Sequence, residues 1–220
     1  MSLVYFVRHG ESVGNHLLEG LSPDENILSE NGHLQAHNLG IHLQNVTFTH
    51  VFASPYIRAI STAEHILSES KAVYSDDVIV VDPDIRERNL GIYEEKSTTE
   101  LVKALMKTGD DYLDWAPEGA ETRLDVERRL ESFLKKIEMI VDSGLEEKTI
   151  LVVTHCTLMV HLWHYLLQTM EKLQDEAQPR ELEVVVAHGS DHLKSLQQDA
   201  FSSFANREKS LASRKSCMQQ

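Results

Sequence analysis

Short apolar runs alternate along this chain with longer stretches in which apolar residues recur at helical spacing. The short runs are rich in β-branched residues and predict buried strands at residues 4–7, 50–53, 77–81, 149–154 and 182–187. The longer stretches predict helices at residues 29–44, 56–69, 97–107, 122–141 and 158–170. Because strands and helices alternate and crossovers are right-handed, we expect an α/β fold, a three-layer sandwich with a mostly parallel central sheet and helices on both faces.

The same pattern sets the expected domain organisation. We expect one folded domain over residues 1–204, since a chain of 220 residues can bury a substantial core. A polar loop is expected to follow the first strand and to run through Leu28. Residues 205–220 are expected to form a flexible tail, because they carry basic residues without apolar periodicity. The first strand begins almost at the start of the sequence, so no signal peptide is expected before it.

Composition and charge narrow the classes of function. With 41% hydrophobic and 25% charged residues, the chain has the composition of a globular protein. The formal net charge of −14 opposes binding to nucleic acid or to an anionic membrane. No apolar run approaches the ~18 residues of a membrane span. Cys156 and Cys217 are too few for a disulfide framework, so we expect a cytoplasmic protein.

Chemically active side chains follow four of the predicted strands. Arg8 and His9 come directly after the first, Arg58 lies in the first turn of the helix after the second, Glu87 follows the third, and His155 follows the fourth. Open α/β sheets place ligand sites at this carboxyl edge. Guanidinium groups match phosphate oxygens, and a neutral imidazole can attack an electrophile. Each residue alone has a structural alternative, namely a solvated Arg58, a Glu87 surface ion pair or a packed His155. Their joint occurrence favours phosphoryl chemistry.

Several separated motifs follow one another in a specific order. They are Arg8-His9-Gly10-Glu11 with Asn15, Leu28-Ser29-Glu30-Asn31-Gly32 with Gln35-Ala36, Ser54-Pro55 to Arg58 with Thr62-Ala63, Arg86-Glu87-Arg88 with Gly91, Pro117 to Thr122, and His155. In these motifs the chain resembles the histidine phosphatase superfamily, the phosphoglycerate mutase-like proteins, from about residue 4 to residue 165. It departs from the family where Cys156 follows the second histidine, a position that is often glycine.

The resemblance implies a role for each of these residues. His9 would take the phosphoryl group as a covalent phosphohistidine, Glu87 would donate the proton, and the group would be surrounded by Arg8, Arg58, Asn15 and His155. We expect Glu87 to have a raised pKa and His155 to act as a positively charged transition-state stabiliser that is hydrogen-bonded to the phosphoryl oxygens. Because the arginines and this imidazolium supply positive charge, we expect no metal and no other cofactor.

Three further residues are assigned to the substrate pocket, namely Glu11, Ser12 and Cys156. For Cys156, a small packed side chain is preferred over a redox switch, since no second cysteine lies near it in the sequence. The expected substrate is a small phosphorylated metabolite.

The chain offers other histidines that could compete for a role. His188 follows the last predicted strand and precedes a glycine, but the order of elements and the apolar helix behind His155 favour His155. Two pairs at helical spacing could hold a metal ion, and packed or solvated side chains are preferred for both. These pairs are His33 with His37 and His161 with His164.

Three functions are compatible with this sequence. The preferred one is a phosphatase that hydrolyses a small phosphomonoester, the first alternative is a cofactor-dependent phosphoglycerate mutase, and the second is a non-catalytic phosphoester-binding regulatory protein of the same fold. Residues 94–116 contain three lysines and no arginine, which favours transfer to water over return to substrate. The helix at 122–141 is expected to face the core, and a homodimer is left open.

Overall fold

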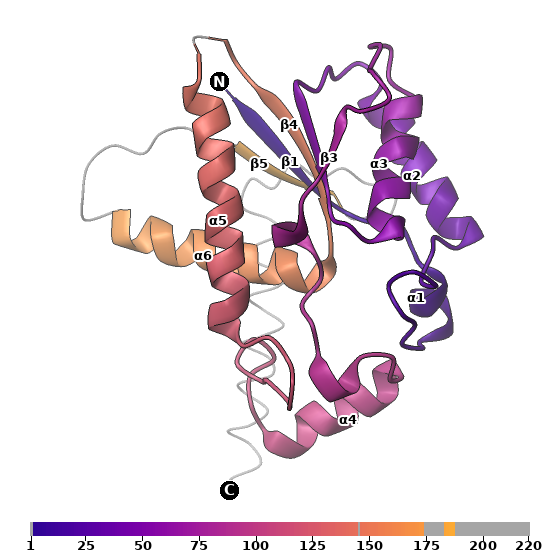
Figure 1. Cartoon of the computed structure of the whole chain (residues 1–220), viewed down its shortest axis with the longest axis vertical. Coiled ribbons are helices and arrows are strands. Elements are labelled where there is room, and N and C mark those ends of the chain that lie inside the picture. Colours follow the sequence, from indigo (N-terminus) through magenta and orange to yellow (C-terminus); the bar gives the residue numbers. More distant parts are fainter. Residues whose placement is uncertain (1, 145, 174–182, 188–220) are drawn as a thin grey trace, which may run out of the picture.

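A parallel sheet forms the centre of the molecule. The computed structural model describes residues 2–144, 146–173 and 183–187. Within these residues the sheet has five strands in the order β3-β2-β4-β1-β5, and every pairing is parallel (Figure 1). The strands are β1 (Leu3–Arg8), β2 (His50–Ala53), β3 (Ile79–Val81), β4 (Thr149–Thr154) and β5 (Glu183–Ala187).

Helices cover both faces of this sheet. They are α1 (Val13–Leu17), α2 (Glu30–Leu43), α3 (Ile57–Ser68), α4 (Thr98–Thr108), α5 (Arg123–Asp142) and α6 (Cys156–Leu173), with short 3₁₀ turns η1 (Pro83–Ile85) and η2 (Gly91–Tyr93). The helices α2 and α3 lie on one side, and α5 and α6 lie on the other (Figure 1). The predicted α/β sandwich is confirmed, with a sheet whose described strand pairings are all parallel.

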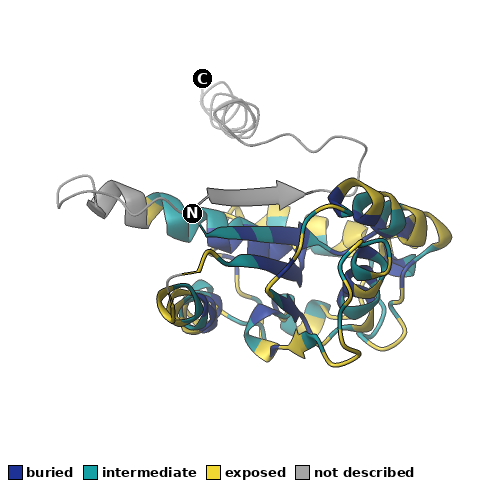
Figure 2. Cartoon of the chain, turned by 90° about the horizontal axis from the view of Figure 1, so that it is seen from above, coloured by how far each residue is buried: buried dark blue, intermediate teal, exposed yellow. Residues whose placement is uncertain are grey.

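The alternation of side chains along the central strands explains the two layers of core. Val4 and Phe6 of β1 pack with α5 and α6, whereas Val7 of the same strand packs with α2 and α3. In β4, Ile150 and Val152 face the first of these layers, and Leu151 and Val153 face the second. Strands buried on both faces are apolar throughout, which is why the sequence shows continuous runs here. Figure 2 shows buried residues at the centre of the sheet and exposed residues on the outer sides of the helices.

The register of the sheet determines where the site lies. β1 and β4 pair residue by residue from Leu3 with Thr149 to Arg8 with Thr154. Because the two strands end at the same level, His9 and His155 leave the sheet side by side. This places the two histidines at the carboxyl edge that the sequence predicts.

Several predicted boundaries were wrong, and the helix α1 was missed. The stretch expected to be a polar loop contains α1, which Ser12 and Asn15 start with a capping box and which ends at Leu18 in the left-handed conformation. It buries only Gly14, so it has no apolar periodicity to detect. The third strand is shorter than predicted, and α6 begins at Cys156 rather than at residue 158.

Some predictions lie partly or wholly outside the described residues. The expected tail at 205–220, His188 and Cys217 are among them, and the boundary at residue 204 stays a prediction. The homodimer also stays a prediction. In the part of the chain that the structure describes, no helix combines the length and the apolar character needed to cross a membrane.

Candidate active site

His9 lies at the end of β1 with one ring nitrogen engaged and the other facing a cation. Its side chain is buried, and Nδ1 is 2.6 Å from the carbonyl oxygen of Gly10, so Nδ1 carries the proton and donates it. Nε2 then accepts a hydrogen bond from Nε of Arg58 at 3.3 Å. Burial, followed by the charges of Arg58 and Arg8, lowers the pKa of His9 to about 3. The imidazole is therefore neutral at physiological pH, with its lone pair on Nε2.

Two arginines beside His9 have buried nitrogens without a protein partner. Nη1 of Arg58 and Nε of Arg8 make no hydrogen bond with any described residue. Arg58 comes from the first turn of α3, where the backbone amides and the helix dipole also favour an anion. A buried guanidinium donor without a partner is costly. The arrangement therefore fits an anion that accepts these donors next to Nε2 of His9.

A hydroxyl group holds the His9 loop against α3. Thr62 Oγ1 donates to the carbonyl of Arg58 at 2.7 Å and accepts from the amide of Gly10 at 3.1 Å. Gly10 also permits close packing, because a Cβ atom there would lie 2.5 Å from the carbonyl oxygen of Gly32 at the start of α2. The nucleophile loop is thus fixed by two helices of the same layer.

His155 is completely buried at the end of β4. Its Nδ1 lies 3.4 Å from Nη2 of Arg58, which is a donor, so Nδ1 accepts and Nε2 donates to Ser54 Oγ at 2.6 Å. The rings of His155 and His9 are 5.0 Å apart between centroids. Burial, then the neighbouring His9 and Arg58, lower the pKa of His155 well below its usual value. Burial among cations thus disfavours protonation of His155 in this structure, and its expected positive charge in the transition state stays a prediction.

Glu87 lies against the amino end of α6. Its carboxylate accepts from the backbone amides of Arg88 at 2.9 Å and of Thr157 and Leu158, each at 3.3 Å. Burial raises the pKa of Glu87, as the sequence predicts, while the amide donors and Arg58 act in the opposite direction. The amino terminus of α6 thus orients the Glu87 carboxyl group, and burial favours the protonated form of that group.

The buried guanidinium of Arg88 holds the segment that follows α4. It donates to four backbone carbonyls, at 3.0, 3.1, 3.4 and 2.6 Å, which belong to Glu121, Tyr112, Leu113 and Trp115 respectively. Tyr112 in turn places its hydroxyl 2.8 Å from Thr157 Oγ1 at the start of α6. Because Arg88 follows Glu87 in the chain, this network also fixes the position of the proposed acid.

Three residues that the sequence assigns to substrate or phosphate binding make contacts within the protein. Ser12 is buried, and its hydroxyl accepts from the amide of Asn15 to start α1. Asn15 is exposed, and its Oδ1 accepts from the amide of Ser12. The Glu11 carboxylate accepts the hydroxyl of Ser29 at 2.6 Å, which ties the loop to α2. Their assignment to substrate or phosphate binding stays a prediction.

Cys156 is exposed at the first position of α6, so the preferred packed side chain was wrong. The helix begins directly after His155, whose carbonyl already accepts from the amide of Met159. The thiol therefore stands at the helix amino end, where the charges of Arg8 and Glu87 reach it.

The predicted constellation comes together, and some of its members were not predicted. The structure gathers Arg8, His9, Arg58, Glu87 and His155 at the carboxyl edge of the sheet. Sequence reasoning did not assign roles to Ser54, Tyr56 and Tyr112. Ser54 and Tyr56 both lie in the motif from Ser54 to Arg58, which could have indicated them, whereas Tyr112 lies outside the motifs.

The histidine pairs considered for metal binding have different partners. His33 Nδ1 lies 2.8 Å from His65 Nε2, and His37 pairs with Glu69 at 3.0 Å, so both connect α2 to α3. His161 is fully buried on α6, and neither of its ring nitrogens has a hydrogen-bond partner among the described residues. Among the described residues, no three histidine, cysteine or acidic side chains form a group that could hold a metal ion.

The fold and the site together define a class: a parallel α/β protein that presents a neutral histidine between unpaired arginine donors at the carboxyl edge of its sheet. The chain belongs to the histidine phosphatase superfamily (branch 1), whose family model matches residues 4–198.

Two kinds of relative support this membership. Fructose-2,6-bisphosphatase TIGAR of Xenopus tropicalis is 40% identical over 145 residues, which cover 65% of this chain and 51% of the relative. A probable phosphoglycerate mutase GpmB of Erwinia tasmaniensis is 34% identical over 101 residues, 46% of this chain and 45% of the relative. This chain thus spans about half the length of the curated relatives it matches.

Solved structures show the same architecture. A phosphoglycerate mutase from Bacillus anthracis superposes with a TM-score of 0.65 at 26% identity, covering 76% of this chain and 81% of that one. A mycobacterial glucosyl-3-phosphoglycerate phosphatase in complex with VO3 gives a TM-score of 0.60 at 26% identity, covering 74% and 79%.

Proposed function

We propose that this protein is a phosphomonoesterase that hydrolyses a small phosphorylated metabolite through a phosphohistidine at His9. The observation that carries the proposal is the neutral Nε2 of His9 beside the unpaired buried donors of Arg8 and Arg58. Phosphoryl transfer requires in-line positioning and neutralisation of oxygen charge, and these groups supply both.

In the first step, the phosphate oxygens accept the free donors of Arg8 and Arg58. Nε2 of His9 then bonds to phosphorus while the ester P–O bond breaks, and its electron pair goes to the leaving oxygen. Glu87 donates its proton to that oxygen, and the leaving group departs as an alcohol. The Gly10 carbonyl, which accepts from Nδ1, stabilises the positive charge that forms on the His9 ring.

In the second step, water attacks phosphorus and Glu87 takes its proton. The Nε2–P bond breaks, its electron pair returns to His9, and inorganic phosphate leaves. His155 acts in both steps by accepting from Arg58, which fixes the guanidinium toward the phosphoryl group. The raised pKa of Glu87 matches a group that must give and then recover a proton near neutral pH.

The printed activities of relatives support this class of substrate. Relatives are named as fructose-2,6-bisphosphatases and as a glucosyl-3-phosphoglycerate phosphatase. Both names describe hydrolysis of phosphate esters of small molecules. The mutase alternative rests on relatives named phosphoglycerate mutase, so it is measured in parallel.

The proposal is tested by trapping the intermediate. The full chain is incubated with a chelator and ³²P-labelled para-nitrophenyl phosphate, quenched in base within the first turnovers, and mapped by mass spectrometry. We expect an acid-labile, base-stable phosphoryl group on His9 and steady release of phosphate. The variant H9N should show neither, whereas H50A, at the opposite end of the sheet, should behave as the wild type. A label on serine or cysteine, a need for added metal, or conversion of 3-phosphoglycerate without phosphate release would overturn the proposal.

A further inference from the structure

Tyr56 forms one wall of the proposed active site. It directly precedes α3, and its ring centroid lies 5.0 Å from that of His155. The guanidinium carbon of Arg58 lies 4.8 Å from the centre of the same ring. Tyr56 is half-buried, so it is held against two groups of the site while part of it stays open to solvent. It can therefore contact the part of a substrate that extends beyond the transferred phosphate.

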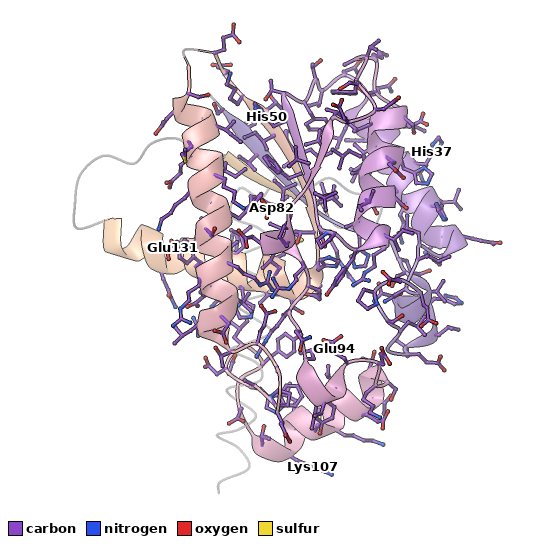
Figure 3. All side chains as sticks on the ribbon, viewed as in Figure 1. His37, His50, Asp82, Glu94, Lys107 and Glu131 are labelled. Carbon is purple, nitrogen blue, oxygen red and sulfur yellow. The ribbon has the colours of Figure 1, made fainter. Side chains whose placement is uncertain are left out.

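Glu94 places a carboxylate beside this tyrosine. It follows η2, and Oε1 accepts the backbone amide of Leu90, while no described residue donates to Oε2. Burial raises the pKa of Tyr56, and the charge of Glu94 raises it further. Burial lowers the pKa of Arg58, and the charge of Glu94 opposes that shift. Figure 3 shows Glu94 between the carboxyl edge of the sheet and α4. The exposed carboxylate is thus near enough to Tyr56 and Arg58 for its charge to act on both.

The other arginines near this edge form ion pairs or hydrogen bonds within the protein. Arg86 pairs with Glu121 at 2.6 Å, and Arg129 donates to the same carboxylate at 2.9 Å. Arg88 is satisfied by backbone carbonyls. Arg123 pairs with Glu127 at 2.7 Å. Of the arginines at this edge in the described ranges, Arg8 and Arg58 alone keep buried donors without a partner.

The lysines of residues 94–116 do not add a second group of free cations beside Arg8 and Arg58. Hydrogen bonds from Ser97 lower the pKa of the exposed Glu100 carboxylate, and the charges of Lys96 and Lys103 act on it in the same direction. Lys107 projects away from the sheet at the far side of α4 (Figure 3). Within the described part of the chain, the approach to the site therefore carries a carboxylate and a phenol rather than a second cationic cluster.

We infer that Glu94 and Tyr56 form a leaving-group subsite that accepts the hydroxyl or amino groups of a phosphomonoester and disfavours a second phosphate. A carboxylate oxygen without a protein partner accepts hydrogen bonds from hydroxyl groups, whereas a phosphate in its place would meet like charge. This inference rests on the proposed phosphatase activity and specifies its substrate class. It separates this chain from relatives whose names specify a bisphosphate substrate.

The test compares two substrates that differ by one phosphate. The values of kcat/KM are measured for fructose 6-phosphate and fructose 2,6-bisphosphate with the wild type and with E94K, E94Q and Y56F. We expect the wild type to prefer the monophosphate at least tenfold, and E94K to shift this ratio at least tenfold toward the bisphosphate. E94Q and Y56F should weaken the preference without reversing it. Because the readout is a ratio, a general loss of activity in a variant cancels.

The control separates local charge from net charge. E138K makes the same change of charge on the exposed face of α5, and its substrate ratio should equal that of the wild type. Para-nitrophenyl phosphate reports the basal activity of the wild type. If that substrate is not hydrolysed, the proposed function fails. If it is hydrolysed but the wild type prefers the bisphosphate, or E94K leaves the ratio unchanged, the inference on the subsite is overturned and the phosphatase proposal stands.

Discussion

Burial shifts the pKa values of His9 and Glu87 in opposite directions, and the proposed chemistry uses both shifts. Burial lowers the pKa of His9 to about 3 and leaves the imidazole neutral. Burial raises the pKa of Glu87 and favours its protonated form. Desolvation always disfavours the charged form, so one environment prepares a neutral nucleophile and a protonated acid. The two roles can be distinguished by experiment, because the rate lost on removing the acid should depend on the leaving group of the substrate.

The change of Glu87 to glutamine should affect only substrates that need a proton. E87Q keeps an oxygen that can accept from the α6 amides but loses the acidic proton. We expect kcat/KM to fall about a hundredfold or more for an alkyl phosphate such as glycerol phosphate, and little for para-nitrophenyl phosphate, whose anion leaves unaided. Steady-state kinetics on both substrates measure this, with E118Q in the neighbouring exposed loop as control. Equal losses on both substrates would assign the proton to another group.

His155 is predicted to matter through Arg58. H155A removes the acceptor that fixes the Arg58 guanidinium and opens a space next to His9. We expect turnover to fall about a hundredfold, the range for loss of one preorganised group. H188A serves as the comparison, because His188 is the other late histidine that the sequence offers for the role of His155. His188 lies outside the described residues. A severe loss in H188A with little change in H155A would contradict the assignment.

At the scale of elements, the helix α6 both positions Glu87 and packs in the core. Its amino end presents amides to Glu87, and its body packs in the layer with α5. His161 lies in that body, fully buried among the charges of Arg88, Arg123 and Arg129, and burial lowers its pKa to about 4. The ring nitrogens of His161 have no hydrogen-bond partner in the described part of the chain, which reduces stability because the unfolded state hydrates them.

The variant H161L should therefore be more stable than the wild type. Leucine has a similar volume and no polar atoms, so we expect the free energy of unfolding at pH 7 to rise by about 1–3 kcal/mol. Urea denaturation followed by circular dichroism measures the change. The activity should persist, since His161 takes no part in the proposed chemistry. A loss of stability would show that the ring nitrogens are hydrogen-bonded to internal water in solution.

At the scale of the whole molecule, the buried histidines make folding sensitive to acid. His9, His155 and His161 all have lowered pKa values in the folded state. Below about pH 6.5 the unfolded chain binds protons that the folded protein excludes, so stability is lost as the pH falls. The loss continues toward pH 4 for His161 and toward pH 3 for His9. Glu87, whose pKa is raised, offsets part of it, because protonation favours its folded form.

This gives a measurable slope. Between pH 6.5 and pH 5 we expect the free energy of unfolding to fall by up to about 1.4 kcal/mol per pH unit for each buried histidine. H161L should reduce the slope by one histidine's share. The measurement is a series of urea titrations at constant ionic strength. A stability that is flat or rises on acidification would mean that these histidines are protonated in the folded protein.

The sequence by itself determined the architecture and the chemical groups of the site. Apolar runs marked the strands because a sheet covered on both faces must be apolar throughout. Arg8, His9, Arg58, Glu87 and His155 could be selected because each follows a strand, and parallel strands end at one edge. These are properties of neighbouring residues, which local sequence encodes directly.

Tertiary structure alone decided the contacts and the protonation of those groups. The pairing of β1 with β4 placed His9 beside His155, and the packing of α3 set which nitrogen of each ring carries the proton. The neutrality of His155 and the structural partner of Glu11 follow from burial and from contacts between distant segments. Such contacts depend on how the layers pack, and desolvation depends on the whole surrounding shell, so no local pattern in the sequence could fix them.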